Sequence, residues 1–261
     1  MSTLGHYIDG GAAQVHLRAC GLSGEQPPLL CLHPAPYSGL FFTTAMPLIA
    51  ADRMVIAPDY PGYGGSTAPD APPSIADYAQ AMLDVIDALD SEVVDVLGFH
   101  TGCLVGAELS LLRPAAVNRL LLIDVPYFDA NERAGLLETA AAPRKLTPEL
   151  ASLETDWAFS ITGRLDTMPY ERAFALLAES LRAGDRSHWG FRAAFSYPCE
   201  ERFAALAAET IMIATDSGLR EPTRRAAAAL PAARLAEVDI ERAVFEENAP
   251  VIAAASHAAL P

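Results

Sequence analysis

The heptapeptide Val96-Leu97-Gly98-Phe99-His100-Thr101-Gly102 joins a short apolar run to a segment of helical period. The run is rich in Val and Leu and predicts a buried strand that ends at Gly98. Gly98 and Gly102 flank His100 at equal distance in the sequence, and small residues at such places allow a sharp, strained turn from strand to helix. We therefore expect this turn to present the His100 side chain at the end of the strand.

Similar apolar runs alternate with helical segments along most of the chain. This alternation is typical of βαβ units and predicts an α/β fold with a mostly parallel, doubly wound sheet. One expected crossover helix is Ser74–Leu89, where Ser74 and Asp77 resemble a capping box. The expected strands are Gln14–Ala19, Leu29–His33, Met54–Pro58, Val93–Gly98, Arg119–Asp124, Thr210–Thr215 and Arg234–Val238.

The alternation stops between Tyr127 and Glu209, where aromatic residues cluster with Leu and Ala. A helical insertion between two parallel strands can lie over their carboxyl ends, where such sheets bind ligands. We predict one domain over residues 1–261 with a helical cap inserted at 127–209. An ordinary helical subdomain without a lid role is the alternative.

Composition limits the classes of partner. The formal charge of −15 makes a nucleic-acid or anionic-membrane partner unfavourable, because their phosphate groups repel an acidic surface. Residues 1–9 do not resemble a secretory signal, and no apolar run is long enough to span a bilayer, so a cytoplasmic location is expected. No metal, nicotinamide or flavin motif is present, so we expect a small-molecule substrate and no cofactor. The oligomeric state stays open.

Three stretches resemble the α/β-hydrolase superfamily. Leu29–Ala35 is similar to a strand followed by the family's His-Gly loop, and Val55–Ser66 to its D-x-P-G-x-G-x-S turn. The turn around His100 resembles the G-x-S-x-G nucleophile elbow. The resemblance implies the α/β-hydrolase fold, with an atypical member that carries histidine where the family has its serine.

The exchange of serine for histidine changes the chemistry that is expected. A serine in the elbow forms an acyl intermediate, whereas imidazole is better suited to accept a proton near neutral pH. We assign His100 as a general base first and as a nucleophile second. The resemblance implies an oxyanion hole built from the amides of Thr101 and Ala35. Pro34 stands at the family's glycine position and has no N–H, but Ala35 keeps its amide.

The remaining members of the family's triad are displaced or missing. Asp216 follows the strand that usually precedes the acid, and Asp124 stands at an alternative acid position. Either could orient the imidazole of His100. The loop after the last expected strand, residues 238–250, contains no histidine where the family has one.

Four further residues are expected at a substrate pocket. His33 ends a strand beside the oxyanion loop, with a structural role or a role as partner of His100. Tyr37, His188 and Trp189 are the other candidates, the last two within the expected cap. The aromatic and aliphatic cap predicts a mainly apolar pocket.

These features predict an enzyme that hydrolyses a small, largely apolar carbonyl compound, such as an ester or a lactone, with water activated by His100. A cofactor-free lyase or isomerase that uses His100 for proton abstraction is one alternative. A non-catalytic member that only binds a ligand is another, because a fold alone does not establish activity.

Overall fold

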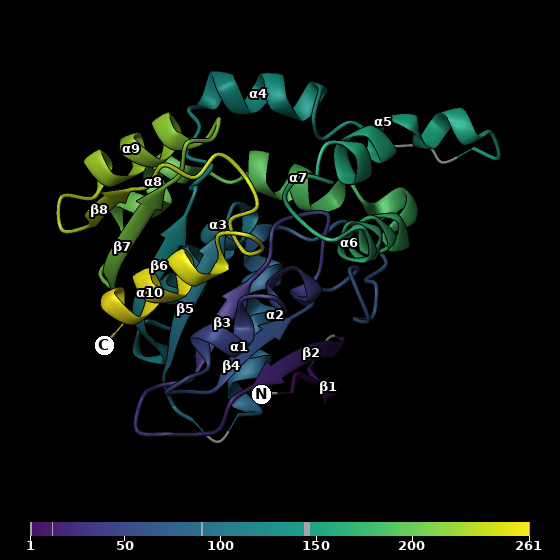
Figure 1. Ribbon diagram of the computed structural model, residues 1–261. Helices are drawn as coiled ribbons and strands as arrows, with labels where there is room; N and C mark the ends of the chain where they lie inside the picture. Colours follow the sequence, from purple (N-terminus) through teal and green to yellow (C-terminus); the bar gives the residue numbers. More distant parts are fainter. Residues whose placement is uncertain (1, 12, 90, 144–146, 261) are drawn as a thin grey trace.

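An eight-stranded sheet in the order β1-β2-β4-β3-β5-β6-β7-β8 forms the centre of the molecule (Figure 1). The computed structural model describes residues 2–11, 13–89, 91–143 and 147–260. β2 is antiparallel to both β1 and β4, and the remaining pairs are parallel, as the sequence predicts. The strands are β1 (Leu4–Asp9), β2 (Gln14–Cys20), β3 (Leu29–Leu32), β4 (Val55–Pro58), β5 (Val94–Phe99), β6 (Val117–Ile123), β7 (Glu209–Ala214) and β8 (Arg234–Glu237).

Strand β1 is absent from the sequence prediction. It forms a hairpin with β2 in which Asp9 lies opposite Gln14, and nearly all of its residues are exposed. An exposed edge strand has no buried face, so it lacks the alternation of apolar and polar residues that identifies most strands.

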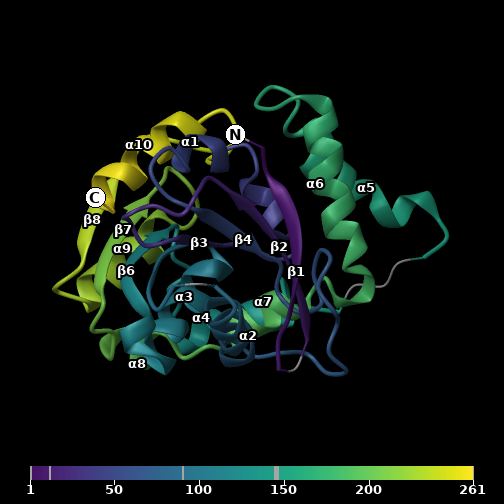
Figure 2. The same cartoon turned by 90° about the horizontal axis from the view of Figure 1, so that it is seen from below.

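Helices cover both faces of the sheet (Figure 2). α1 (Met46–Ile49) and α10 (Ala249–Ala259) pack together on one face, and α2 (Ile75–Asp87) and α3 (Thr101–Leu112) on the other. α9 (Arg220–Ala229) follows β7 and contacts that strand. Two buried apolar clusters lie between these helices and the sheet. The fold is thus a doubly wound α/β fold.

The expected capping box begins α2. Ser74 accepts a hydrogen bond from the Asp77 amide, and the Ser74 amide donates to the Asp77 carboxylate at 2.8 Å. The apolar residues Tyr78, Met82 and Ile86 are buried, so the helix packs its predicted face against the sheet.

The described part of the segment between β6 and β7 consists of helices joined by turns and irregular stretches, and it contains no strand. We call residues 127–209 the cap segment, and Figure 1 shows α4 and α5 beyond one end of the sheet. Its α-helices are α4 (Ala130–Glu138), α5 (Glu154–Trp157), α6 (Tyr170–Arg182), α7 (Trp189–Phe195) and α8 (Cys199–Ala204). The cap segment also contains the short helical turns η3 (Leu150–Leu153), η4 (Ala158–Thr162) and η5 (Gly184–Arg186). Two more such turns, η1 (Gly39–Phe42) and η2 (Pro114–Ala116), lie outside it. None of the helices in the described ranges is both long and apolar enough to cross a membrane.

Candidate active site

His100 occupies a strained turn between β5 and α3. Its backbone has φ 50° and ψ −115°, a conformation that costs a non-glycine residue about 1–3 kcal/mol. A Cβ at Gly98 would lie 2.6 Å from the Gly102 carbonyl oxygen, and one at Gly102 would lie 1.9 Å from the carbonyl oxygen of Leu32. Glycine is therefore required on both sides of His100, for the reason that the sequence suggested.

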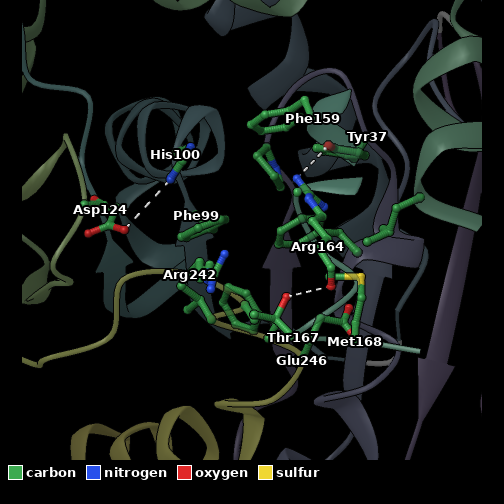
Figure 3. Close-up of a pocket in the computed structure, with 18 of the residues that line it drawn as sticks. Tyr37, Phe99, His100, Asp124, Phe159, Arg164, Thr167, Met168, Arg242 and Glu246 are labelled. Atoms are coloured by element: carbon green, nitrogen blue, oxygen red, sulfur yellow. Dashed lines mark hydrogen bonds and ion pairs between the residues drawn. The ribbon is translucent and has the colours of Figure 1, made fainter. Parts of the chain in front are cut away.

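The His100 imidazole opens into a cavity of about 670 Å³ that lies between the sheet and the cap segment (Figure 3). Its Nε2 lies 3.9 Å from Oδ2 of Asp124, which is ion-pair distance but too long for a hydrogen bond. The Phe99 ring packs against the imidazole with 4.0 Å between the ring centroids.

Burial lowers the pKa of His100 to about 4, and the nearby charge of Asp124 only partly offsets this effect. The side chain keeps 40% of its surface exposed, and it lines the cavity. His100 is thus neutral near pH 7 and has a nitrogen lone pair that can accept a proton.

Asp124 is fixed by Thr215. The Thr215 amide donates to Oδ1 at 2.8 Å, and its hydroxyl donates to Oδ2 at 2.6 Å. Asp124 is buried and has φ 54°, a left-handed conformation that aspartate tolerates better than most residues. These contacts hold the carboxylate at the His100 ring. Sequence reasoning did not identify Thr215 as part of the site.

The structure does not bring Asp216 to His100, which corrects the expectation that either acid could orient the imidazole. The Asp216 carboxylate pairs with Arg220 at 3.1 Å, and its side chain is 51% exposed. Its neighbours Thr215 and Ser217 line the cavity instead. Asp124 is thus the candidate acid that the geometry supports.

The two candidate oxyanion donors lie close to each other. The Ala35 amide points at the Thr101 hydroxyl from 3.5 Å, which is long for a hydrogen bond, and Ala35 lines the same cavity as His100. Thr101 is the first residue of α3, so its amide has no carbonyl partner within the helix. The Ala35 amide is therefore placed to donate to a ligand, whereas Thr101 is buried and is not among the described residues that line the cavity. The two-amide oxyanion hole stays a prediction.

Both ring nitrogens of His33 contact backbone groups at hydrogen-bond distance. Nδ1 lies 3.0 Å from the carbonyl oxygen of Pro34, and Nε2 accepts a hydrogen bond from the Tyr60 amide at 3.0 Å. The side chain is fully buried and does not line the cavity. These contacts support the structural role of His33 and contradict its roles as a pocket residue and as a partner of His100.

The buried neutral state of His33 makes stability depend on pH. Burial lowers its pKa to about 4, whereas an unfolded histidine titrates near 6.5. The unfolded chain therefore binds more protons between these values, and the free energy of unfolding falls as pH drops through this window. The loss from this one group amounts to about 3 kcal/mol near pH 4.

Urea unfolding at a series of pH values measures this loss. His33→Gln is expected to reduce the pH dependence by the His33 share and to leave that of His100, whose pKa is also lowered to about 4. His6→Gln, at an exposed histidine of β1, is expected to leave the pH dependence unchanged. Equal slopes in wild type and His33→Gln would show that His33 does not carry the effect.

Of the other three expected pocket residues, Tyr37 and His188 line cavities and Trp189 does not. Tyr37 lines the cavity of His100, whereas His188 lines a neighbouring cavity of about 260 Å³ that shares Tyr37 and Phe159 with the first. The buried Nδ1 of His188 has no hydrogen-bond partner among the described residues. Trp189 packs beside Gly62, outside both cavities, so its assignment to the substrate pocket is wrong.

Several charged residues that sequence reasoning missed also line the main cavity. Glu246 pairs with Arg172 at 2.7 Å, and Arg242 pairs with Asp166. The other two such residues are Arg164 and Glu241. They lie on loops or in short turns, where no periodic pattern signals a site. No group of three potential metal ligands gathers anywhere in the described part of the chain.

Comparisons with known proteins agree with the fold. A family model described as the alpha/beta hydrolase fold matches residues 27–220, which is more than half of the chain. A hydrolase from Pseudomonas aeruginosa PA01 superposes with a TM-score of 0.81 at 20% identity, covering 98% of both chains. An enol-lactonase from Burkholderia xenovorans LB400 gives a TM-score of 0.75 at 17% identity and covers 98% of this chain and 99% of its own.

Curated relatives match over a shorter stretch. A serine hydrolase-like protein of Homo sapiens is 30% identical over 117 residues, which are 43% of this chain and 58% of that protein. Other curated relatives are matched over as little as 31% of their length. The solved structures are too distant in sequence to show more than the fold, but the family model spans both the turn at His100 and the residues around Asp124. The chain therefore belongs to the α/β-hydrolase fold family.

Proposed function

We propose that the protein is an enzyme that hydrolyses a small, largely apolar carbonyl compound, an ester or a lactone, with His100 as its general base. One observation carries the proposal. A neutral imidazole stands on a strained turn at the wall of a cavity of about 670 Å³, and a fixed carboxylate lies 3.9 Å from its Nε2. Perturbed titratable groups of this kind, placed in a cleft, mark catalytic sites.

The proposed reaction needs no covalent enzyme intermediate. With the proton of His100 on Nε2 toward Asp124, the lone pair of Nδ1 takes a proton from water while the water oxygen attacks the carbonyl carbon. The amides of Ala35 and Thr101 donate to the resulting oxyanion. When the bond to the leaving oxygen breaks, the imidazolium returns its proton to that oxygen. Asp124 stabilises the imidazolium between the two steps.

The lining of the cavity supports a largely apolar substrate. Side chains of Phe41, Phe159, Met168 and Phe245 contribute to the wall, and the volume suits a small organic molecule. A polar carbonyl group would lie at the end of the cavity that His100 and Ala35 share.

A lyase or isomerase reaction is the second candidate. His100 is the only imidazole among the described residues that line the cavity, which supports a single histidine base beside the proposed oxyanion hole. Such a base can remove a proton from carbon next to a carbonyl group, and the oxyanion hole then stabilises the enolate.

Covalent labelling tests whether a serine takes part. The protein is incubated with a serine-directed fluorophosphonate and then assayed on chromogenic esters and lactones. We expect turnover to survive and no serine to carry the label, because the elbow residue is His100. A labelled serine together with lost turnover would contradict the proposal.

The same panel separates the other candidates. Hydrogen exchange into a ketone without ester turnover would favour the lyase or isomerase reading. Binding of panel members without turnover or exchange would indicate a protein that only binds its ligand, and would also contradict the proposal.

A further inference from the structure

Arg164 projects into the cavity of His100 from the cap segment, just after η4. Its guanidinium carbon lies 4.9 Å from the centre of the Phe159 ring and 5.7 Å from that of Tyr37. Its Nη2 donates a hydrogen bond to the Tyr37 hydroxyl at 3.1 Å. Two aromatic rings and a hydroxyl thus hold the guanidinium in one place.

Arg164 has no carboxylate within ion-pair distance in the part of the chain that the structure describes. The other arginine that lines the cavity, Arg242, is paired with Asp166. The nearby Glu246 is neutralised by Arg172 and also accepts a hydrogen bond from Thr44. A guanidinium has five N–H donors, and the single bond to Tyr37 leaves most of them for a ligand.

Arg164 is one of only a few arginines without an ion pair in the part of the chain that the structure describes. The chain carries a formal charge of −15, and many of its arginines pair with carboxylates on the surface, for example Arg133 with Glu200. Placing a cation in a largely apolar cavity costs free energy unless a counter-charge is supplied there. In this cavity the stacked rings offset only a part of that cost.

We propose that Arg164 binds a carboxylate group of the substrate, so that the substrate is an ester or lactone carrying a second, ionised carboxyl group. A planar carboxylate matches the paired donors of a guanidinium and can bind in a bidentate manner. The identity of the reacting group, an ester or lactone, rests on the proposed function. The binding of a carboxylate by Arg164 does not depend on it. Figure 3 places His100 and Arg164 on different sides of the cavity, with Phe99 labelled between them. The substrate's apolar body would lie between its carbonyl group, at His100, and its carboxylate.

Binding of an unreactive pair of compounds tests the proposal without turnover. 4-Phenylbutyrate and 4-phenylbutyramide have nearly the same shape, and only the first is charged. Calorimetry at low salt is expected to show that the wild type binds the acid more tightly than the amide. Arg164→Gln is expected to weaken binding of the acid by about tenfold or more and to leave the amide unchanged.

Arg182→Gln is the matched control, because it removes the same charge from an exposed position of α6 outside the cavity. It is expected to leave both affinities unchanged. The proposal is overturned if the wild type binds acid and amide equally. It is also overturned if Arg164→Gln weakens both compounds alike, since that result indicates a purely structural role.

A kinetic comparison then links the subsite to the reaction. The monoethyl ester of a dicarboxylic acid should have a higher kcat/KM than a neutral ethyl ester of equal length, and Arg164→Gln should abolish this preference. If the acid binds selectively through Arg164 but no ester is hydrolysed, the proposed function fails while the carboxylate subsite stands. If esters are hydrolysed without any preference, the subsite fails while the proposed function stands.

Discussion

Replacing Gly102 by alanine is expected to lower the free energy of unfolding by about 3 kcal/mol. The added Cβ would lie 1.9 Å from the carbonyl oxygen of Leu32, and real Cβ atoms do not approach a backbone oxygen so closely. Leu32 ends β3, which lies between β4 and β5 in the middle of the sheet and cannot move aside cheaply. The turn at His100 would therefore have to distort or the sheet would have to shift.

Gly135→Ala is the control for this change. Gly135 lies inside α4, and a Cβ there meets nothing within 4 Å. Alanine is preferred over glycine in a helix, so this variant is expected to be as stable as wild type or more stable by about 0.5–1 kcal/mol. Urea unfolding monitored by circular dichroism compares the two. An equal effect of both changes would show that the contact with Leu32 does not decide the stability of the turn.

The regular parts of the fold could be predicted from the sequence because burial leaves a periodic pattern. β5 is buried along its whole length and is apolar except for Asp95, and α2 shows both its cap and its apolar face. The prediction failed at Leu4–Asp9, where the strand is mostly exposed and only Ile8 packs against the core. The glycines beside His100 were predictive for a different reason, since their place in the turn excludes any side chain.

The site could be predicted less well because it depends on which side of a loop a residue faces. Asp216 and Thr215 are adjacent in the sequence, but only Thr215 turns inward, where it binds Asp124. Sequence spacing alone does not distinguish these directions outside a regular strand or helix. Arg164 escaped notice because nothing in the sequence around it indicates that the cap segment directs its guanidinium toward Tyr37.

Replacing His100 by alanine is expected to lower kcat/KM by about 10²- to 10⁴-fold on whichever ester or lactone the wild type hydrolyses. The change removes the only imidazole among the described residues that line the cavity, while the amides of Ala35 and Thr101 stay in place. Alanine has no side-chain group that would break the turn. The variant should therefore remain folded, which circular dichroism checks.

Asp124→Asn is a second, milder change at the same site. Its side-chain oxygen can still accept a hydrogen bond from Thr215, but it no longer stabilises a charged imidazole. We expect a smaller loss of kcat/KM than in His100→Ala. A loss in Asp124→Asn with none in His100→Ala would place the chemistry elsewhere in the cavity.

The pH dependence of kcat/KM, measured in parallel for wild type and His100→Ala, decides whether His100 is the base. Because the pKa of His100 is lowered to about 4, we predict that wild-type kcat/KM stays constant between about pH 5.5 and pH 8 and remains far above that of the variant throughout. A wild-type rate that halves near pH 6.5, the value for an unperturbed histidine, would contradict a buried neutral base. A variant that matches wild type across this range would contradict the assignment of His100 altogether.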